Sequence, residues 1–135
     1  QSVIIDGDLR FISEEQKKRT REKMREIISN NLPETSAEIT FFDSYPAMPP
    51  TQKNKDLLKK FSDVSVSMGH GPVEAWDPSK RGAADVSFVA QYVACIDGLG
   101  AMGNWAHTSK ETINLKTFDV LTQRTAVLIY RLVNE

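Results

Sequence analysis

The stretch PAMPP, residues 46–50, constrains the fold more than any other feature of this chain, because three of its five residues are proline. Proline lacks a backbone N–H and clashes with the preceding helical turn, so the stretch excludes both a helix and a central β-strand. It is also the best candidate for a linker. We therefore expect two parts, residues 1–46 and 47–135, each with its own helices and strands.

The first part has a β-α-β pattern. Residues 3–12 mix apolar and charged side chains and predict a strand, in which Gly7 indicates a bulge. Ser13 followed by Gln16 is a capping box, which predicts a helix to about residue 30. Residues 37–45 (AEITFFDSY) predict a second strand. The helix is polar apart from a short apolar stripe, so we expect it to cover one face of a sheet.

The second part has an α/β pattern. Apolar side chains recur at helical spacing in three segments, and two short apolar stretches between them are typical of strands. The expected helices are 52–69, 83–92 and 117–133, and the expected strands are 71–76 and 93–97. A glycine-rich loop follows the second strand. The order helix-strand-helix-strand-loop-helix predicts the α/β fold class.

The number of expected strands is too small for a complete sheet. Each part supplies only two short strands, and a two-stranded sheet is marginally stable in water. An apolar strand such as VACI also needs neighbours on both sides. We therefore expect the chain to be an incomplete fragment of a larger α/β fold.

Charge and hydropathy argue against several classes of protein. The chain carries 17 basic and 18 acidic residues, a net charge of −1, and has no basic face for nucleic acid. No apolar run approaches the ~20 residues of a membrane span, and residues 1–12 lack the features of a signal peptide. We expect no nucleic-acid or membrane partner, and a soluble protein of the cytoplasm or periplasm. The single cysteine, Cys95, lies in an apolar run and is expected to be an inert core thiol.

His107 ends the glycine-rich loop, and Glu111 follows four residues later. Glycines allow close backbone approach, and neutral imidazole is a common zinc ligand. A glutamate at this spacing can meet the histidine on one helical face. The alternative is an ordinary surface loop before a helix that begins at Thr108 or Ser109. Spacing alone favours the surface loop, because a zinc site needs three or four protein ligands.

Two further positions carry candidate chemistry. Arg10 lies in the first expected strand, where its guanidinium can bind a carboxylate through two hydrogen bonds or pair with Asp6 or Asp8. The small residues of RGAAD, 81–85, precede an expected helix whose first amides can bind an anion. Asp85 can instead cap that helix.

Four stretches in this order, GDLRF, the proline-ended return strand, RGAADVSFVA and DGLGAMGNWAHTSKE, resemble one family. They are similar to the C-terminal portion of the dinuclear-zinc metallopeptidases: glutamate carboxypeptidase, acetylornithine deacetylase, succinyl-diaminopimelate desuccinylase and aminoacylase. The glutamate carboxypeptidase type is the most similar, and the resemblance covers essentially the whole chain. It implies that residues 1–46 are the last β-α-β of a ferredoxin-like lid and dimerisation domain. Residues 47–135 would be the C-terminal segment of the catalytic domain.

The resemblance also implies roles for single residues. His107 corresponds to the family's last zinc ligand, and Arg10 to the lid arginine that contacts the substrate's carboxylate. Gly82 and Asp85 belong to a G-x-x-D loop that lines the substrate pocket. The residues implied to shape the loop or to support the histidine are Gly98, Gly100, Gly103 and Glu111.

Several elements of the family pattern have no counterpart in this chain. The family's H-x-D, its bridging aspartate and the Glu-Glu pair that supplies the general base are all missing. Ala83 replaces the usual second glycine of the G-x-x-D loop, and Tyr45-Pro46 stands where some members have an arginine before the proline.

The resemblance implies a function for the parent protein rather than for this chain alone. The parent would be a metallo-carboxypeptidase or amidohydrolase that uses two zinc ions. Its substrate would be a small peptide or N-acyl amino acid with a free carboxylate. The isolated chain is expected to be inactive. One alternative is a non-catalytic association module, a homodimer formed through the lid part or by strand exchange. Another is a free-standing small-molecule binder.

Overall fold

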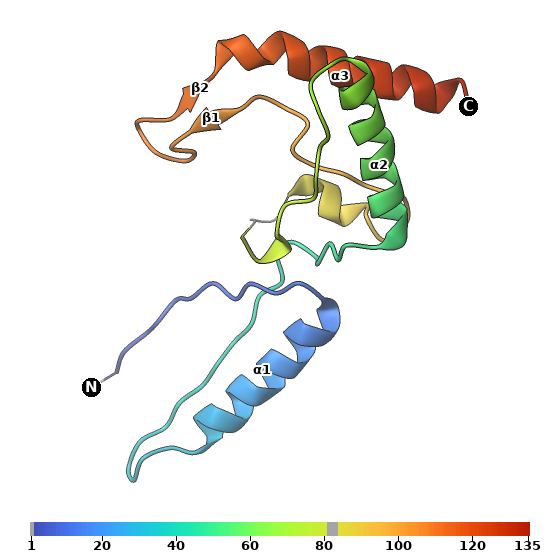
Figure 1. Cartoon of the computed structure of the whole chain (residues 1–135). Coiled ribbons are helices and arrows are strands. Elements are labelled where there is room, and N and C mark those ends of the chain that lie inside the picture. The colour runs from blue at the N-terminus through green and yellow to red at the C-terminus, as the bar shows by residue number, and fades with distance from the viewer. Residues whose placement is uncertain (1, 81–83) are drawn as a thin grey trace.

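A computed structural model describes residues 2–80 and 84–135 of the 135-residue chain. The elements in chain order are helix α1 (Glu14–Ser29), helix α2 (Gln52–Ser67), the 3₁₀ turns η1 (Pro78–Lys80) and η2 (Asp85–Phe88), strands β1 (Gly103–Asn104) and β2 (Thr112–Ile113), and helix α3 (Leu115–Val133). Strands β1 and β2 form a two-stranded antiparallel sheet. The chain is therefore mixed helix and strand, which agrees with the α/β class at a coarse level. Figure 1 shows α1 and its flanking segments at one end and the remaining elements at the other.

The three longest predicted helices are confirmed, and side-chain caps explain where the first two begin. The Ser13 hydroxyl accepts a hydrogen bond from the Gln16 N–H at 3.1 Å. The Gln16 side chain in turn accepts from the N–H of Ile12 at 2.7 Å, so the capping box forms with its return bond one residue early. Helix α2 begins after Thr51, whose hydroxyl accepts from the Asn54 N–H at 3.2 Å. None of the described helices is both long and apolar enough to cross a membrane.

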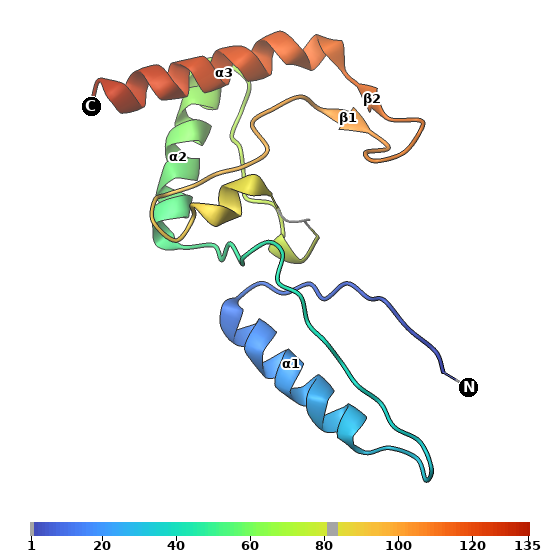
Figure 2. The same ribbon diagram turned by 180° about the vertical axis from the view of Figure 1, so that it is seen from behind.

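The hydrophobic core lies where α2 crosses α3, a contact that is visible from both sides of the molecule (Figures 1 and 2). Phe61 and Val64 of α2 and Leu128 of α3 are its buried members. The guanidinium of Arg124 lies over the Phe61 ring at 5.1 Å and donates to the Ser65 hydroxyl at 3.1 Å. The half-buried side chains around this core are Met68, Val73, Ile96, Leu99 and Val127.

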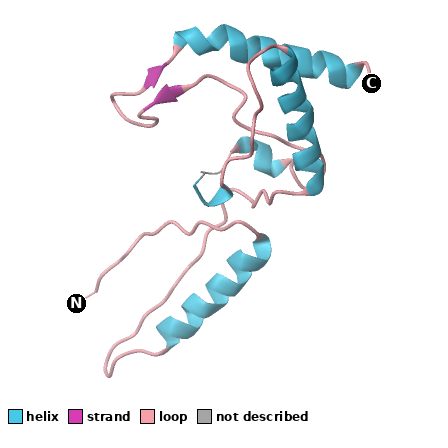
Figure 3. Cartoon of the chain, in the orientation of Figure 1, coloured by secondary structure: helices cyan, strands magenta, loops and turns pink. Residues whose placement is uncertain are grey.

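The four predicted strands are wrong. Residues 3–12, 37–45, 71–76 and 93–97 contain no paired strand, and Figure 3 draws them as loop. A strand is defined by a ladder of backbone hydrogen bonds to a neighbouring strand, and the one strand pair in the described part of the chain, β1 with β2, includes none of these segments. The predicted helix 83–92 is likewise reduced, in its described part, to the 3₁₀ turn η2 and a few further turns. The two short strands that do form lie in the glycine-rich loop, where no strand was predicted.

Helix α1 lies beside both extended segments of the first part and contacts them through cations on aromatic rings and through ion pairs of Lys17 and Arg21 with Asp43. Lys17 lies 5.2 Å from the centre of the Phe11 ring. Arg21 and Arg25 each lie 5.0 Å from the centre of the Phe41 ring. No residue between positions 2 and 46 is fully buried. This part therefore has no hydrophobic core of its own, and several large apolar side chains of its extended segments are more than 80% exposed: Val3, Ile4, Ile5 and Phe42.

Candidate functional site

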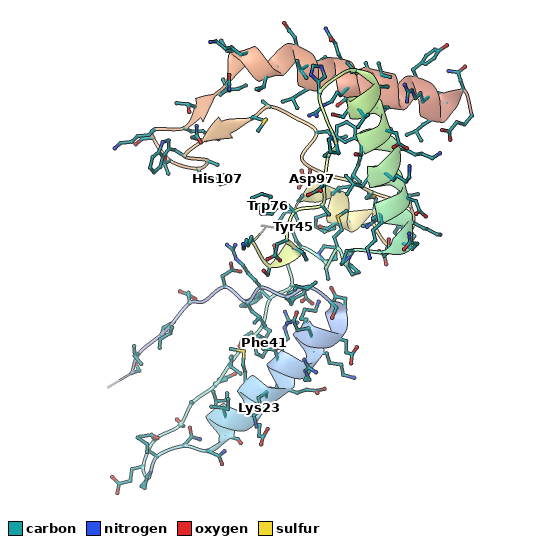
Figure 4. All side chains as sticks on the ribbon, viewed as in Figure 1. Lys23, Phe41, Tyr45, Trp76, Asp97 and His107 are labelled. Carbon is teal, nitrogen blue, oxygen red and sulfur yellow. The ribbon has the colours of Figure 1, made fainter. Side chains whose placement is uncertain are left out.

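His107 lies in the hairpin loop between β1 and β2, away from α1 (Figure 4). Its backbone is left-handed, with φ of 64°, and Trp105 two residues earlier has φ of 59°. These values are uncommon for residues other than glycine, and surrounding contacts must hold them. The N–H of Thr108 donates to the Trp105 carbonyl, and the N–H of Glu111 donates to the Thr108 carbonyl, both at 3.1 Å. Two consecutive turns thus shape the loop.

The sequence left open whether His107 and Glu111 meet on one helical face or lie in an ordinary surface loop, and their spacing favoured the surface loop. No helix forms here, so the two side chains do not share a helical face. Instead the Glu111 carboxylate accepts a hydrogen bond from the backbone N–H of His107 at 3.2 Å. Within the described residues the imidazole itself has no hydrogen-bond partner, and it is exposed. Glu111 therefore fixes the loop and leaves both ring nitrogens of the histidine available.

The three glycines proposed to shape the loop differ in how strictly the backbone requires them. A Cβ atom at Gly103 would lie 1.9 Å from the carbonyl oxygen of Thr112, so strand β1 can pair with β2 only with glycine there. Gly98 has φ of 77°, which side-chain-bearing residues rarely adopt. A Cβ at Gly100 would meet nothing within 4 Å. Two of the three positions therefore have a physical reason to be glycine.

Arg10 is paired with its own segment in this structure. Its Nε lies 2.9 Å from the Asp8 carboxylate, and the two side chains are 76% and 75% exposed. This is one of the two arrangements that the sequence left open. In the described part of the chain no hydrogen bond or ion pair links Arg10 to His107, Glu111 or Asp85. The structure does not bring the predicted substrate contacts and the predicted zinc ligand together.

Asp85 is the first residue of η2 and does not cap it, because the N-cap position is Ala84 and no side chain bonds there. Its carboxylate instead accepts a hydrogen bond from the Tyr45 hydroxyl at 3.0 Å. This bond to a carboxylate raises the pKa of Tyr45. The Tyr45 ring also contacts Phe88, with 5.2 Å between ring centres. Gly82, the other predicted member of this loop, lies outside the described residues.

Charged side chains gather beside this contact, at the first turn of α1. The Glu14 carboxylate accepts the N–H of Ala47 at 3.0 Å. Hydrogen bonds from Lys17 and then from Ala47 hold the pKa of Glu14 below its ordinary value. Asp43 binds Arg21 at 2.8 Å and Lys17 at 3.2 Å, which lowers its pKa in the same way. Sequence reasoning missed this junction, since its members are far apart in the chain and match no motif.

Between α1, the linker and η2 there is a hollow of about 400 Å³. The residues that line it are Glu14, Lys17, Asp43, Ser44, Tyr45, Pro46, Ala47, Ser87, Phe88 and Gln91. Residues from both sides of the proline-rich stretch therefore face one space. Side chains do not fill this space, so it is no hydrophobic core.

No group of three or more His, Cys, Asp or Glu side chains that could hold a metal is found among residues 2–80 and 84–135. The exposed and unbonded imidazole of His107 suits a zinc ligand, but its described neighbours supply no second one. A zinc centre that includes His107 would take its other ligands from elsewhere. Cys95 is buried, as expected of a core thiol, and its N–H donates to the Asn54 side chain at 2.9 Å.

No family model, curated protein or solved structure matches this chain. The resemblance to zinc peptidases therefore stays a prediction from four sequence stretches, and the function has to be argued from the residues and their geometry.

Proposed function

We propose that this chain is the C-terminal part of a dinuclear-zinc peptidase or amidohydrolase, to which it contributes His107 as one metal ligand. The parent protein would hydrolyse the amide bond of a small peptide or N-acyl amino acid that has a free carboxylate. The observation that carries the proposal is the way His107 is held. An exposed, unbonded imidazole lies in a loop that paired strands close and that the Glu111 carboxylate fixes through a backbone N–H.

The backbone strain of this loop supports the proposal. Two non-glycine residues within three positions, Trp105 and His107, have left-handed φ values. Each such residue costs of order 1 kcal/mol, and strain of this kind clusters at functional sites. An ordinary surface turn could use asparagine or glycine there at lower cost. The arrangement fits a loop whose sequence is selected to present one side chain.

In such a centre the residues of this chain have limited and distinct roles. The imidazole of His107 would donate a lone pair to the metal, and Glu111 would be a positioning residue that acts through the loop backbone. Bound zinc would lower the pKa of a water molecule that attacks the amide carbonyl. The guanidinium of Arg10 suits the substrate's carboxylate, since its exposed pair with Asp8 is worth little and is easily exchanged. The general base and the other ligands would come from polypeptide outside this chain.

The first prediction concerns zinc binding. The 135-residue chain alone should bind zinc no better than a surface histidine does and should hydrolyse no N-acyl amino acid, because one imidazole makes no zinc site. In the parent protein, His107→Ala should lower the zinc content by about one ion per chain and reduce turnover by at least ~100-fold. Isothermal titration of the chain and metal analysis of the parent measure these effects.

His70 provides the matched control, because it is exposed and lies in a turn at the end of α2. His70→Ala should leave the zinc content and turnover of the parent unchanged. Tight binding of two zinc ions by the chain alone would refute the proposal. So would a His107→Ala parent protein with its full zinc content.

A second candidate function, a non-catalytic association module, is favoured by the extended segments of the first part. Among the described residues, segments 3–11 and 37–45 make no backbone–backbone hydrogen bond. Unpaired strand edges are templates for pairing with another chain. The occupant would be a second copy of this chain, paired through these segments or by strand exchange.

Sedimentation equilibrium distinguishes an association module from a monomeric chain. An association module should sediment as a dimer at micromolar concentration, and a charged substitution such as Ile4→Lys should return it to a monomer. A matched change outside the segments, Val66→Lys on the exposed side of α2, should leave the dimer intact. A chain that remains monomeric at every concentration argues against an association module.

A further inference from the structure

We infer that Tyr45 and Glu14 form a two-point latch that fixes residues 1–46 against residues 47–135, with the linker 44–50 as the hinge. Packing between secondary-structure elements does not fix this arrangement. Among the described elements, α2 contacts α3 and β1 contacts β2, while α1 contacts no other helix or strand. The relative placement of the two parts therefore depends on contacts made by the linker itself.

The first point of the latch joins the linker to η2. The Tyr45 hydroxyl donates to the Asp85 carboxylate at 3.0 Å, across 40 positions of sequence. Its ring lies against Phe88, the last residue of η2, at 5.2 Å and with 51° between the ring planes. A hydrogen bond to a charged acceptor is stronger than one between neutral groups, and a tilted ring pair adds to it. Figure 4 shows Tyr45 where the linker passes η2.

The second point joins the linker to α1. Ala47, two residues after Tyr45, donates its N–H to the Glu14 carboxylate at 3.0 Å. Lys17 pairs with the same carboxylate and holds it in its charged form. Pro46 lies between the two points, and its ring fixes one of the backbone dihedrals that a reorientation would use. The two contacts are thus coupled through a short and partly rigid stretch.

A hollow of about 400 Å³ lies beside the latch, so the two parts are not held together by close packing there and the latch can open reversibly. Since no packed core spans α1, the linker and η2, release of the latch would expose little additional apolar surface. A junction held by two exposed polar contacts and one ring pair can open without unfolding either part. Asp85 is then a positioning residue for the first part. None of these contacts involves His107 or Arg10, so the inference does not rest on the zinc centre.

The experiment measures amide hydrogen exchange at Ala47 in the 135-residue chain by nuclear magnetic resonance. Tyr45→Phe removes the hydroxyl and keeps the ring, and it should raise the Ala47 exchange rate about fivefold, the effect of losing one hydrogen bond. Asp85→Asn should act in the same direction. The double variant should exchange no faster than the more affected single variant, because both changes break the same bond.

Tyr92→Phe is the matched control, since Tyr92 is 74% exposed and its hydroxyl has no hydrogen-bond partner among the described residues. It should leave the Ala47 exchange rate unchanged. Amides of α2 should exchange at the same rate in all variants, which shows that the α2–α3 core stays folded. An unchanged Ala47 rate in Tyr45→Phe, an equal rise in Tyr92→Phe, or additive effects in the double variant would overturn the inference.

Discussion

Phe61→Ala is expected to reduce the free energy of unfolding of residues 47–135 by about 3–5 kcal/mol, the largest effect of any single substitution considered for this part. Phe61 is 3% exposed and, with Val64 and Leu128, it makes up the buried contact between α2 and α3. Among the described elements these helices pack on no other helix or strand. No third helix or strand of the described part is therefore in place to fill the cavity left by the ring.

The substitution also removes the aromatic ring on which the Arg124 guanidinium lies. Arg124 lies over the Phe61 ring, and its Nε is already buried without a hydrogen-bond partner among the described atoms. Without the ring, this partly buried charge loses a favourable contact and gains none. The cost should therefore fall in the upper half of the range for a phenylalanine in a core.

Urea denaturation followed by circular dichroism at 222 nm measures this effect. The control is Phe118→Ala, the same change at a position of α3 that is 50% exposed, which should cost under about 1 kcal/mol. Helix α1 should keep its signal in both variants, because it contacts neither α2 nor α3. Similar losses in the two variants would show that the α2–α3 contact is not the core of this part.

The helices could be predicted from the sequence because their signals are local. Ser13 and Thr51 accept hydrogen bonds from N–H groups three residues later, and the apolar side chains of α2 recur at helical spacing. The strands could not be predicted in the same way, since a strand depends on a partner that a local pattern does not reveal. Residues 3–12 and 37–45 have the composition of strands and remain extended, yet no other described segment forms a strand ladder with them.

The same distinction between local and long-range signals applies to the candidate site. The spacing of His107 and Glu111 left a contact on one helical face open and favoured a surface loop. The bond that forms is to the His107 backbone N–H, because a hairpin loop forms there instead of a helix. Tyr45 was noted only as a departure from a family pattern. Its role depends on Asp85, which lies 40 positions away in the sequence. The hairpin was missed because its strands are two residues each and include a glycine and an asparagine.

Gly103→Ala is expected to open the β1–β2 hairpin that carries His107. The new Cβ would lie 1.9 Å from the carbonyl oxygen of Thr112 and 3.0 Å from its carbonyl carbon, both backbone atoms that no side-chain rotation can move away. Overlap of this kind costs about 1–3 kcal/mol where the structure can adjust, and more where it cannot. A two-stranded hairpin is marginally stable, so this cost exceeds what the pairing contributes.

The measurement is the set of cross-strand nuclear Overhauser effects between Gly103 and Ile113 and between Asn104 and Thr112, the two pairs that define the register. They should disappear in Gly103→Ala. Gly100→Ala is the matched control, because a Cβ there meets nothing within 4 Å, and it should keep all of them. Cross-strand contacts that survive in Gly103→Ala would show that the backbone adjusts more easily than the close approach indicates.

The same pair of variants tests how the loop serves the proposed metal centre. If the hairpin holds His107 in place for zinc, Gly103→Ala in the parent protein should weaken zinc binding by about 10–100-fold, the usual effect of disturbing a ligand's support. Gly100→Ala should not weaken it. Glu111→Gln keeps an acceptor for the His107 N–H but loses the charge, so its effect on zinc should be smaller than that of Gly103→Ala. Normal zinc affinity together with a lost hairpin would mean that His107 reaches the metal without help from β1 and β2, and the loop geometry would then no longer support the proposed function.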